Sequence, residues 1–432
     1  MRNEAISMPK RLRILSSSIA ANFSKLFVAN VVAQTIGLLI YPILTRLYRP
    51  EDFGLFNVFI SIGSILVILA NCEYQNAILL PKTRHEAVAV VHSMIPTVGM
   101  VTLLSGLCVP MSGIIEDAFN APGFAQISWL LPLFIMLTAL WNILNFWLMR
   151  SQCYTSISTY QVVQSLTAAG SKVGLGSLTQ AFGLCLSAVI ALLIGLFSGI
   201  GVTQKRYLYP LFTRTTAIER KAVRAKYHKF PLFTMPSTLI TDVRNNLPIW
   251  VLTPAFCLES VGFYGLAVTL AFQPIRLFSR SLYQVFFQHV TERMRQHQSF
   301  MPLIRKYTLL ILGIALPTFT ALWFVLPTLI VWLLGNGYQE TGEYIQLMLP
   351  WALCSLVGGV LCFIPNIFRK QHVAMWIELV YTALELVALL IGVWTNSMRI
   401  AIFGYSIVAT IVIIGQTVWY FQLVHRYELT LK

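Results

Sequence analysis

Residues 306–335, KYTLLILGIALPTFTALWFVLPTLIVWLLG, contain one charged side chain, Lys306, at their start. A helix needs about 20 mainly apolar residues to cross the hydrocarbon core of a bilayer, so this stretch is long enough to span a membrane. Similar apolar stretches recur along the chain, separated by charged residues or by proline and glycine. The twelve expected spans are 24–47, 53–80, 88–112, 126–149, 154–177, 179–202, 233–256, 260–288, 306–335, 343–367, 373–394 and 399–424.

The composition agrees with a chain that lies mostly in lipid. Of the 432 residues, 57% are hydrophobic and only 11% are charged, with a formal net charge of +15. A soluble globular chain carries about 25% charged residues, which it needs to cover its surface. The composition therefore excludes most soluble enzymes and nucleic-acid-binding proteins, and we expect no nucleic acid partner. It predicts an all-α integral membrane protein.

The positive charges indicate the orientation of the spans. With the amino terminus placed in the cytoplasm, 24 of the 31 Lys and Arg residues fall on cytoplasmic segments. Only Arg46, Arg49 and Arg399 fall on outer loops, and four fall inside spans. Such an excess is typical of the cytoplasmic side. We expect both termini in the cytoplasm and, because the first apolar run belongs to a full-length span, no cleaved signal peptide.

A hydrophilic stretch near the midpoint divides the chain. Residues 203–231 hold eight cations and one acid, Glu219, which is typical of a cytoplasmic linker lying on anionic lipid headgroups. Six expected spans precede it and six follow. The predicted organisation is an N-terminal lobe (1–202), this linker and a C-terminal lobe (232–432). Two six-span halves around a central cavity are a recurrent plan of transporters.

A weak internal repeat supports the two halves. An offset of 208 residues places similar residues at the same position of each half. The aligned pairs are Leu44-Thr45 with Leu252-Thr253, Glu51 with Glu259, Gly54 with Gly262, and Phe56 with Tyr264. Because each half has an even number of spans, these pairs predict two repeats of parallel topology.

Eight ionisable side chains fall inside the expected spans. A charge at the bilayer centre costs ~2.5–3.5 kcal/mol on insertion scales, so each of them must face protein, water or a partner. They are Glu73, Lys172, Asp242, Arg244, Arg276, Arg280, Glu378 and Glu385.

The arginines and the lysine are candidate anion-binding residues. Arg276 and Arg280 are four residues apart and share a helix face, where they either capture an anionic headgroup or extend to the interface. Asp242 and Arg244 point in different directions, so each needs its own partner. Arg244 either offers its donor fork to a phosphate or forms an interhelical salt bridge. Lys172 lies among glycines that predict close helix packing, and it faces either the cavity or the interface.

The intramembrane acids have two interpretations. Glu378 and Glu385 are seven residues apart on one face of the eleventh span. Each carboxylate either exchanges a proton during transport or, as we prefer, neutralises a nearby arginine. Glu73, expected in the inner part of the second span, has the same two interpretations.

Cysteines and histidines predict neither metal binding nor catalysis. The seven cysteines lie in or beside spans without metal-type spacing, so we expect free thiols. The seven histidines contain no HExxH pair.

Four segments resemble bacterial polysaccharide-biosynthesis flippases. Residues 41–54, YPILTRLYRPEDFG, resemble the first-loop signature of that family, and residues 73–81, EYQNAILLP, are similar to the end of its second span. Residues 335–350 are similar to its ninth-to-tenth loop, and residues 273–287 resemble its eighth span. The resemblance covers nearly the whole chain, and the first segment is its most specific part.

The resemblance implies a fold and a function. The family belongs to the multidrug/oligosaccharidyl-lipid/polysaccharide exporter superfamily, which includes lipid II flippases and drug–cation antiporters. It implies two six-helix lobes arranged as a V around a central cavity, in the bacterial inner membrane. It also implies alternating access that moves an undecaprenyl-diphosphate-linked oligosaccharide to the outer leaflet, for O-antigen, capsule or exopolysaccharide synthesis.

Site residues, cofactors and partners follow from the same resemblance. Family members bind the diphosphate through cavity cations whose positions vary, so these are assigned here by chemistry and location to Lys172, Arg244, Arg276 and Arg280. The motif residues that are expected to shape the outer loop are Arg46, Pro50, Glu51 and Gly54. We expect no resident cofactor. We do expect coupling to H⁺ or Na⁺, contacts with membrane lipids, and the polymerase and chain-length proteins of the same pathway as partners.

Two other functions remain open. A drug–cation antiporter of the same superfamily usually carries mid-membrane carboxylates in its first lobe, where Glu73 is the only span acid here. A membrane polysaccharide polymerase or ligase needs a large catalytic segment outside the membrane, whereas the outer loops of this chain run about ten residues. Both are weaker than the flippase interpretation.

Overall fold

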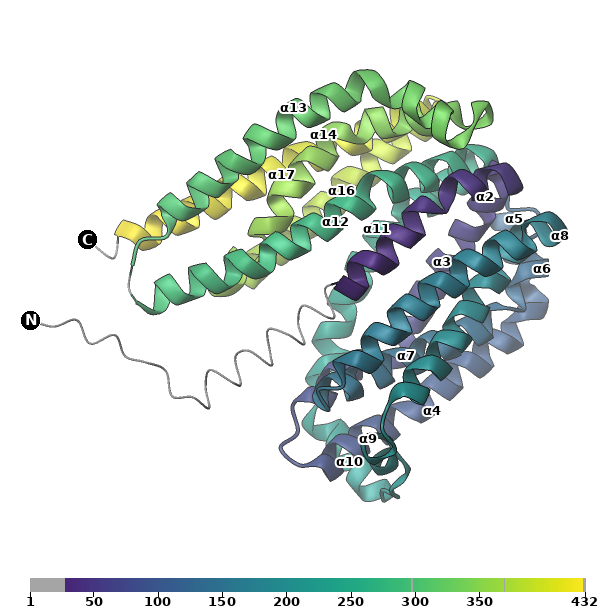
Figure 1. Cartoon of the computed structure of the whole chain (residues 1–432), viewed down its shortest axis with the longest axis vertical. Coiled ribbons are helices and arrows are strands. Elements are labelled where there is room, and N and C mark those ends of the chain that lie inside the picture. Colours follow the sequence, from purple (N-terminus) through teal and green to yellow (C-terminus); the bar gives the residue numbers. More distant parts are fainter. Residues whose placement is uncertain (1–27, 297, 369, 430–432) are drawn as a thin grey trace, which may run out of the picture. The chain divides into compact units, whose positions relative to one another are not determined.

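The computed structural model describes residues 28–296, 298–368 and 370–429. Side chains are not described at residues 177–179, 280, 281, 284, 285, 288, 291, 292, 295 and 371. The described residues form helices joined by short turns, with no β-strand among them (Figure 1). The first four residues of the predicted span 24–47 lie outside the described residues, and the chain is helical from residue 28 onward.

The helices follow one another along the chain with few long connections. The first half contains α2 (Tyr41–Leu47), α3 (Pro50–Asn71), η1 (Tyr74–Leu79), α4 (Arg84–Cys108), α5 (Ser112–Ala118), α6 (Phe124–Ser128), α7 (Leu131–Arg150) and α8 (Tyr154–Val202). The middle contains α9 (Lys205–Leu208), η3 (Tyr209–Phe212), α10 (Ala217–Lys226) and η4 (Phe230–Thr234). The second half contains α11 (Met235–Ala255), α12 (Leu258–Arg295), α13 (Met301–Leu334), α14 (Gln339–Leu361), α15 (Ile364–Ile367), α16 (Gln371–Trp394) and α17 (Met398–Leu429).

Ten helical stretches among the described residues are long and apolar enough to cross a membrane. The two predicted spans outside these ten are the first part of α8 and α11, which are helical but richer in polar residues. A break at Gln180 (φ 46°, ψ −135°) divides α8 close to the expected boundary between two spans. The prediction of an all-α membrane protein is confirmed.

The second predicted span ends earlier than the sequence suggested. α3 stops at Asn71, and Glu73 follows in a left-handed conformation (φ 58°, ψ 11°), with Asn76 Nδ2 donating a hydrogen bond of 2.6 Å to its carboxylate. The placement of Glu73 inside a span was therefore wrong. Hydrophobicity alone continues through the apolar residues 77–80, but two consecutive left-handed residues, Cys72 and Glu73, end the α-helix.

The described chain divides into two compact units that are not contiguous in sequence. The first unit contains residues 28–40, 59–115 and 123–243, and the second contains residues 41–58, 116–122 and the described part of 244–432. α3 and α11 therefore contribute residues to both units. The division into lobes 1–202 and 232–432 around a linker stays a prediction.

In the first unit, residues 203–231, the central basic segment, pack against α4 through several hydrogen bonds. The two ring nitrogens of His92 lie 2.8 Å from the Thr215 hydroxyl and from the Leu211 carbonyl oxygen. Arg224 donates to the Ser93 carbonyl, and Lys226 forms an ion pair with Glu86. These bonds give the segment a defined conformation.

Gly170 and Gly174, on either side of Lys172, permit close helix packing, but no described element makes use of it. A Cβ atom added at either glycine would meet nothing within 4 Å. The tight glycine contact of α8 is instead at Gly195, where a Cβ would collide with the ring of Tyr160. Glycine spacing shows where a close approach is permitted, and a neighbouring element decides where it occurs.

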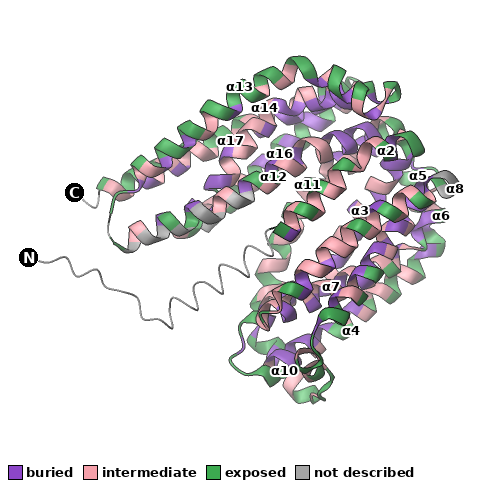
Figure 2. Ribbon diagram, in the orientation of Figure 1, coloured by how far each residue is buried: buried purple, intermediate pink, exposed green. Residues whose placement is uncertain are grey.

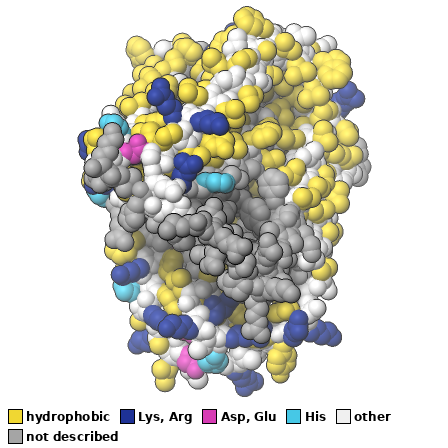
Figure 3. Space-filling model, turned by 60° about the vertical axis from the view of Figure 1, so that its left-hand side comes forward, with side chains coloured by type: hydrophobic (Ala, Val, Ile, Leu, Met, Phe, Trp, Pro, Cys, Tyr) yellow, Lys and Arg dark blue, Asp and Glu magenta, His cyan; other side chains and the backbone are white. Residues whose placement is uncertain are grey.

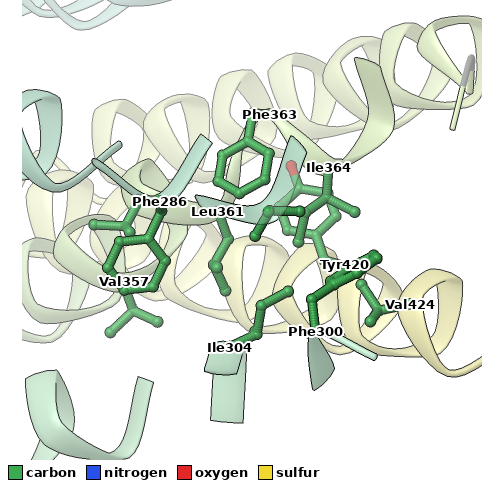
Figure 4. Close-up of a cluster of buried hydrophobic side chains, with 11 residues drawn as sticks. Phe286, Phe300, Ile304, Val357, Leu361, Phe363, Ile364, Tyr420 and Val424 are labelled. Carbon is green, nitrogen blue, oxygen red and sulfur yellow. The ribbon is translucent and has the colours of Figure 1, made fainter. Parts of the chain in front are cut away.

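In the second unit, α14 is the central helix. α12, α13 and α17 pack against it, and α16 packs against α17 (Figure 1). Their cytoplasm-directed ends, in the predicted orientation, meet in a buried cluster that includes Phe286, Phe300, Ile304, Tyr420 and Val424 (Figure 4). These residues are far apart in sequence, so the cluster holds the ends of α12, α13 and α17 together.

The residues paired by the 208-residue offset meet in the second unit. A Cβ atom at Gly54 would collide with the carbonyl oxygen of Leu258, and a Cβ at Gly262 would collide with that of Pro50. Because Pro50 and Leu258 are themselves related by the offset, the start of α3 and the start of α12 make the same contact in both directions.

The family-like segment has a structural role at this contact. Pro50 begins α3, and Asp52 accepts a hydrogen bond of 2.9 Å from the Arg49 backbone N–H, so this segment sets the first turn of the helix. The Tyr338 hydroxyl donates to the Tyr48 carbonyl over 2.6 Å. Arg46 and Glu51 are exposed.

Apolar side chains cover much of the outside of the second unit. α13 is the least buried of the ten span-length helices, and Figure 2 shows exposed residues along it. The face in Figure 3 carries hydrophobic side chains over broad areas, with Lys and Arg in separate groups. This distribution suits helices that face lipid, with cations at the interface.

Candidate functional site

A cavity of about 520 Å³ lies inside the second unit, between α11, α12, α14, α16 and α17. Five of the eight predicted intramembrane ionisable residues belong to these helices and have described side chains: Arg244, Arg276, Glu378, Glu385 and Asp242. The first three line the cavity. The site is therefore charged although four of its five helices, α12, α14, α16 and α17, are among the ten apolar stretches long enough to cross a membrane.

Arg244 is already neutralised in this cavity. Its Nε lies 3.3 Å from Oε2 of Glu378, and its guanidinium carbon lies 4.7 Å from the centre of the Tyr381 ring. The ion pair joins α11 to α16, and the ring face adds a cation–π contact. Of the two interpretations of Arg244, the structure contains the interhelical salt bridge.

Glu385 is an electrostatic neighbour of both Arg244 and Glu378 but does not line the cavity. Its side chain is fully buried, and neither carboxylate oxygen has a hydrogen bond of normal geometry among the described residues. The hydroxyls of Tyr381 and Tyr405 lie beside it, and Arg244 is its electrostatic neighbour. A carboxylate in such surroundings depends on the arginine for charge compensation, because isolated buried charges are costly.

Arg276 differs from Arg244 because no acid with a described side chain pairs with it. Its side chain is accessible and lines the cavity from α12, and within the described part of the chain it has neither an ion pair nor a hydrogen bond. An arginine presents five N–H donors in a planar fork that matches phosphate oxygens. Arg276 is thus the cavity cation available to an anionic ligand.

Aromatic rings and small polar groups form the remaining wall. The Trp351 ring centre lies 4.0 Å from that of Phe272 and 5.3 Å from that of Tyr405. Asn245 and Gln416 also line the cavity. Such a wall offers flat apolar surfaces and several hydrogen-bonding groups to one ligand. Sequence reasoning missed these residues, because an aromatic side chain in a span packs against protein or faces lipid more often than it lines a cavity.

Three other predicted site residues with described side chains do not line this cavity. Lys172, Asp242 and Glu73 belong to the first unit, where Asp242 accepts a hydrogen bond of 2.7 Å from the Ser64 hydroxyl. Lys172 is half-buried near the Cys185 thiol. Arg280 lies one turn after Arg276, and its side chain falls outside the described residues.

Another arginine that the sequence treated only as an orientation marker has a defined function in the fold. Arg150, at the end of α7, donates to the carbonyl oxygens of Ile78, Leu79, Pro81 and Thr83. One guanidinium therefore satisfies four carbonyls of the segment between α3 and α4. No sequence motif announces this contact, because its acceptors are backbone atoms.

The sequence family is decided by a match that covers most of the chain. The family described as "Polysaccharide biosynthesis protein" matches residues 43–343. The chain belongs to this polysaccharide biosynthesis family. The match begins in the Tyr41–Gly54 segment and ends at Glu343, so it includes Arg244 and Arg276.

Part of this chain is similar in sequence to a protein of polysaccharide biosynthesis. The amylovoran biosynthesis protein AmsL of Erwinia amylovora is 22% identical over 166 residues, which are 38% of this chain. The alignment spans 42% of that protein, less than half of its length.

Solved structures of membrane transporters share the fold. The lipid II flippase MurJ, in an inward closed conformation, has a TM-score of 0.74 at 12% identity, over 95% of this chain and 91% of that chain. An inward-facing multidrug resistance transporter of the MATE family, in the MOP superfamily, has a TM-score of 0.66 at 12% identity, over 94% and 95%. The predicted two-lobed, all-α fold is confirmed, and this polysaccharide biosynthesis family member is a multi-pass membrane protein.

Proposed function

We propose that the protein is a flippase that moves an undecaprenyl-diphosphate-linked oligosaccharide from the cytoplasmic to the outer leaflet of the bacterial inner membrane. The family membership supports a role in polysaccharide synthesis, and the lipid II flippase MurJ has a similar fold. O-antigen, capsule and exopolysaccharide pathways each require this step. No catalytic residue is needed, since no covalent bond changes.

The observation that carries the proposal is Arg276, which has no ion pair among the described residues and lines a cavity with aromatic and amide walls. A diphosphate cannot cross hydrocarbon unless its charge is compensated, and the Arg276 fork offers charge-assisted hydrogen bonds to it. Sugar hydroxyls donate and accept, as do Asn245 and Gln416, while sugar ring faces fit against Trp351. The lipid tail stays in the bilayer.

The Arg244–Glu378 pair contributes differently. Glu378 neutralises Arg244. An anion in the cavity is therefore bound mainly by one arginine, Arg276, rather than by two. A transporter must release its cargo, so one dominant cation favours turnover over tight retention. Exchange of Glu378 for a substrate phosphate on Arg244 would supply a second contact during transport, and coupling to H⁺ or Na⁺ would involve Glu378 or Glu385.

Both termini are proposed to lie in the cytoplasm, following the distribution of Lys and Arg. The polymerase and chain-length proteins of the same pathway are proposed partners on the outer side. Single cysteines introduced at Lys205 and at Asn336 of a variant whose seven native cysteines are replaced test this orientation. An impermeant maleimide added to intact cells should label only position 336, and the reverse pattern contradicts it.

The experiment for the flippase function uses proteoliposomes that contain a fluorescent undecaprenyl-diphosphate oligosaccharide. A lectin added outside reports how fast the sugar reaches that leaflet. Arg276→Ala should slow translocation roughly tenfold or more, the effect of losing a charge-assisted hydrogen bond, and Arg276→Lys should retain part of it. Arg426→Ala, which removes an exposed arginine outside the cavity, is the matched control.

The alternative function, drug–cation antiport, is favoured by one observation, the similarity in fold to the MATE transporter. It predicts that expression raises the drug resistance of a pump-deficient strain and that a chromosomal deletion leaves surface polysaccharide unchanged. The flippase proposal predicts the opposite: unchanged drug resistance, with lipid-linked oligosaccharide accumulating on the inner leaflet of the deletion strain.

A further inference from the structure

A second cavity, of about 470 Å³, lies in the second unit where α13 begins and α17 ends. It shares no lining residue with the cavity of Arg276. The lining residues are Met301, Arg305, Thr308, Leu309, Phe421 and His425. Three of them are polar or cationic and three are apolar, so the cavity itself is amphipathic.

The cavity is held by the fold rather than by a loose loop. Glu428, near the end of α17, accepts hydrogen bonds from the Met301 backbone N–H (2.8 Å) and from the Ser299 hydroxyl, which fastens the start of α13 to α17. Phe300, Ile304 and Val424, from the same two helices, belong to the buried cluster of Figure 4. The positions of Arg305 and His425 are therefore set by a packed core.

Arg305 and His425 are available to a ligand. Both side chains are exposed, and within the described ranges neither has a hydrogen bond or an ion pair. Glu428 is the acid of this end of α17, and it is occupied by its two bonds to the start of α13. A guanidinium and an imidazole thus face one cavity, beside the Thr308 hydroxyl. These groups together can donate several hydrogen bonds to one phosphate.

The apolar part of the cavity continues along the outside of α13. Leu309 lines the cavity and is 59% exposed, and Leu316, two turns further along the same face of α13, is 56% exposed. Exposed leucines on a span-length helix are typical of a surface that faces lipid tails. A ligand bound at Arg305 and His425 therefore has an apolar track beside it.

We propose that this cavity binds the headgroup of an anionic phospholipid. The phosphate lies between Arg305, Thr308 and His425, and an acyl chain lies along Leu309 and Leu316. Basic pockets between membrane helices on the cytoplasmic side are suited to such headgroups, and the predicted orientation places this end of α13 on that side. The site is separate from the proposed substrate cavity. Failure of the phospholipid proposal would therefore leave the flippase proposal unaffected, and the reverse also holds.

Native mass spectrometry of the purified full-length protein in detergent tests the site. The probes are phosphatidylglycerol, phosphatidylcholine with the same acyl chains, and inorganic phosphate. The native protein should retain phosphatidylglycerol in preference to phosphatidylcholine. The variant Arg305→Ala with His425→Ala should bind phosphatidylglycerol roughly tenfold more weakly, because two donors to the phosphate are removed.

The matched control is Lys306→Ala with Arg426→Ala, which removes two cations from adjacent positions of the same helices but not from the cavity. It should bind phosphatidylglycerol like the native protein. An equal loss in this control indicates diffuse attraction and overturns the proposal, as does equal retention of phosphatidylcholine. Thermal stabilisation by inorganic phosphate equal to that by phosphatidylglycerol also overturns it, in favour of a free-anion site. Should the double alanine variant fail to fold, Arg305→Gln alone gives the same comparison.

Discussion

Arg244 Nε lies 3.3 Å from Oε2 of Glu378, and this pair leaves Arg276 as the unneutralised arginine among the described cavity residues. The two partners are not equally protected, since the side chain of Arg244 is 18% exposed and that of Glu378 is 39% exposed. Solvent therefore weakens the attraction between them. Arg244 has a second neighbour, the buried Glu385, so its loss leaves two carboxylates without compensation.

A double-mutant cycle measures this relationship. Arg244→Met should lower the thermal stability of the purified protein more than Glu378→Gln does, because Arg244→Met leaves both acids uncompensated. The double variant should be more stable than the sum of the single effects predicts, with a coupling free energy of about 1 kcal/mol. Strict additivity of the two changes would contradict a direct pair.

The reciprocal glycine contact predicts a second stability effect. Gly54→Ala and Gly262→Ala should each destabilise the protein by about 1–3 kcal/mol, because the added methyl group meets a backbone carbonyl that no rotamer change can move. Thermal unfolding in detergent gives the comparison. Gly313→Ala in α13, where a Cβ meets nothing within 4 Å, should be neutral or stabilising. Equal effects at all three glycines would mean that the contact is not tight.

Arg150 predicts a third effect, in the first unit. Arg150→Lys keeps the charge but not the planar fork, so it cannot serve the Ile78, Leu79, Pro81 and Thr83 carbonyls together. We expect a loss of about 1–3 kcal/mol, mainly from the carbonyls of the buried residues Ile78 and Pro81, and faster proteolysis in the segment between α3 and α4. Lys82→Ala removes an exposed cation of that segment and should change neither measurement. Native-like resistance of Arg150→Lys would show that charge alone suffices.

The start of α10 predicts a pH dependence. The Thr216 backbone N–H donates to Glu219 over 2.7 Å, and this bond, with smaller help from His85, lowers the pKa of Glu219 from 4.5 to about 2. A lowered pKa means that the contribution to stability is complete above pH 4.5 and is lost as the pH falls through about 2. A spin label at Lys221→Cys, with the native cysteines replaced, should stay immobile down to pH 4.5 and gain mobility below it.

The variant Glu219→Gln is the reference for that titration. Thr216 and Glu219 form a capping box, in which each side chain accepts a hydrogen bond from the other residue's backbone N–H. Glu219→Gln weakens this capping box at every pH, so the label should be more mobile at pH 7 and respond less to acid. An unchanged acid response in Glu219→Gln would assign the transition to another carboxylate.

The sequence predicted the parts of the fold that depend on local patterns. Long apolar runs such as 306–335 define helices because hydrophobicity and helix length are both local properties. The end of α3 was misplaced because a left-handed turn at Cys72 and Glu73 interrupts a run that stays apolar. Local hydrophobicity contains no information about that backbone conformation.

The candidate site was predictable only as a list of charges. Burial cost marks Arg244, Arg276, Glu378 and Glu385 as residues that need a partner, and that argument requires no structure. Which arginine receives which acid depends on the packing of α11 against α16, helices separated by more than a hundred residues. The aromatic wall and the phospholipid cavity are equally non-local, since they arise where helices distant in sequence meet.

The contact of Gly54 with Gly262 has the geometry of an isologous interface. Pro50 meets Gly262 as Leu258 meets Gly54, which is the exchange made across the twofold axis of a homodimer. A single polypeptide thus contains the self-complementary surface of two half-length subunits. Any change at one of these glycines therefore has a counterpart position at the other, because the same contact is made twice within one chain.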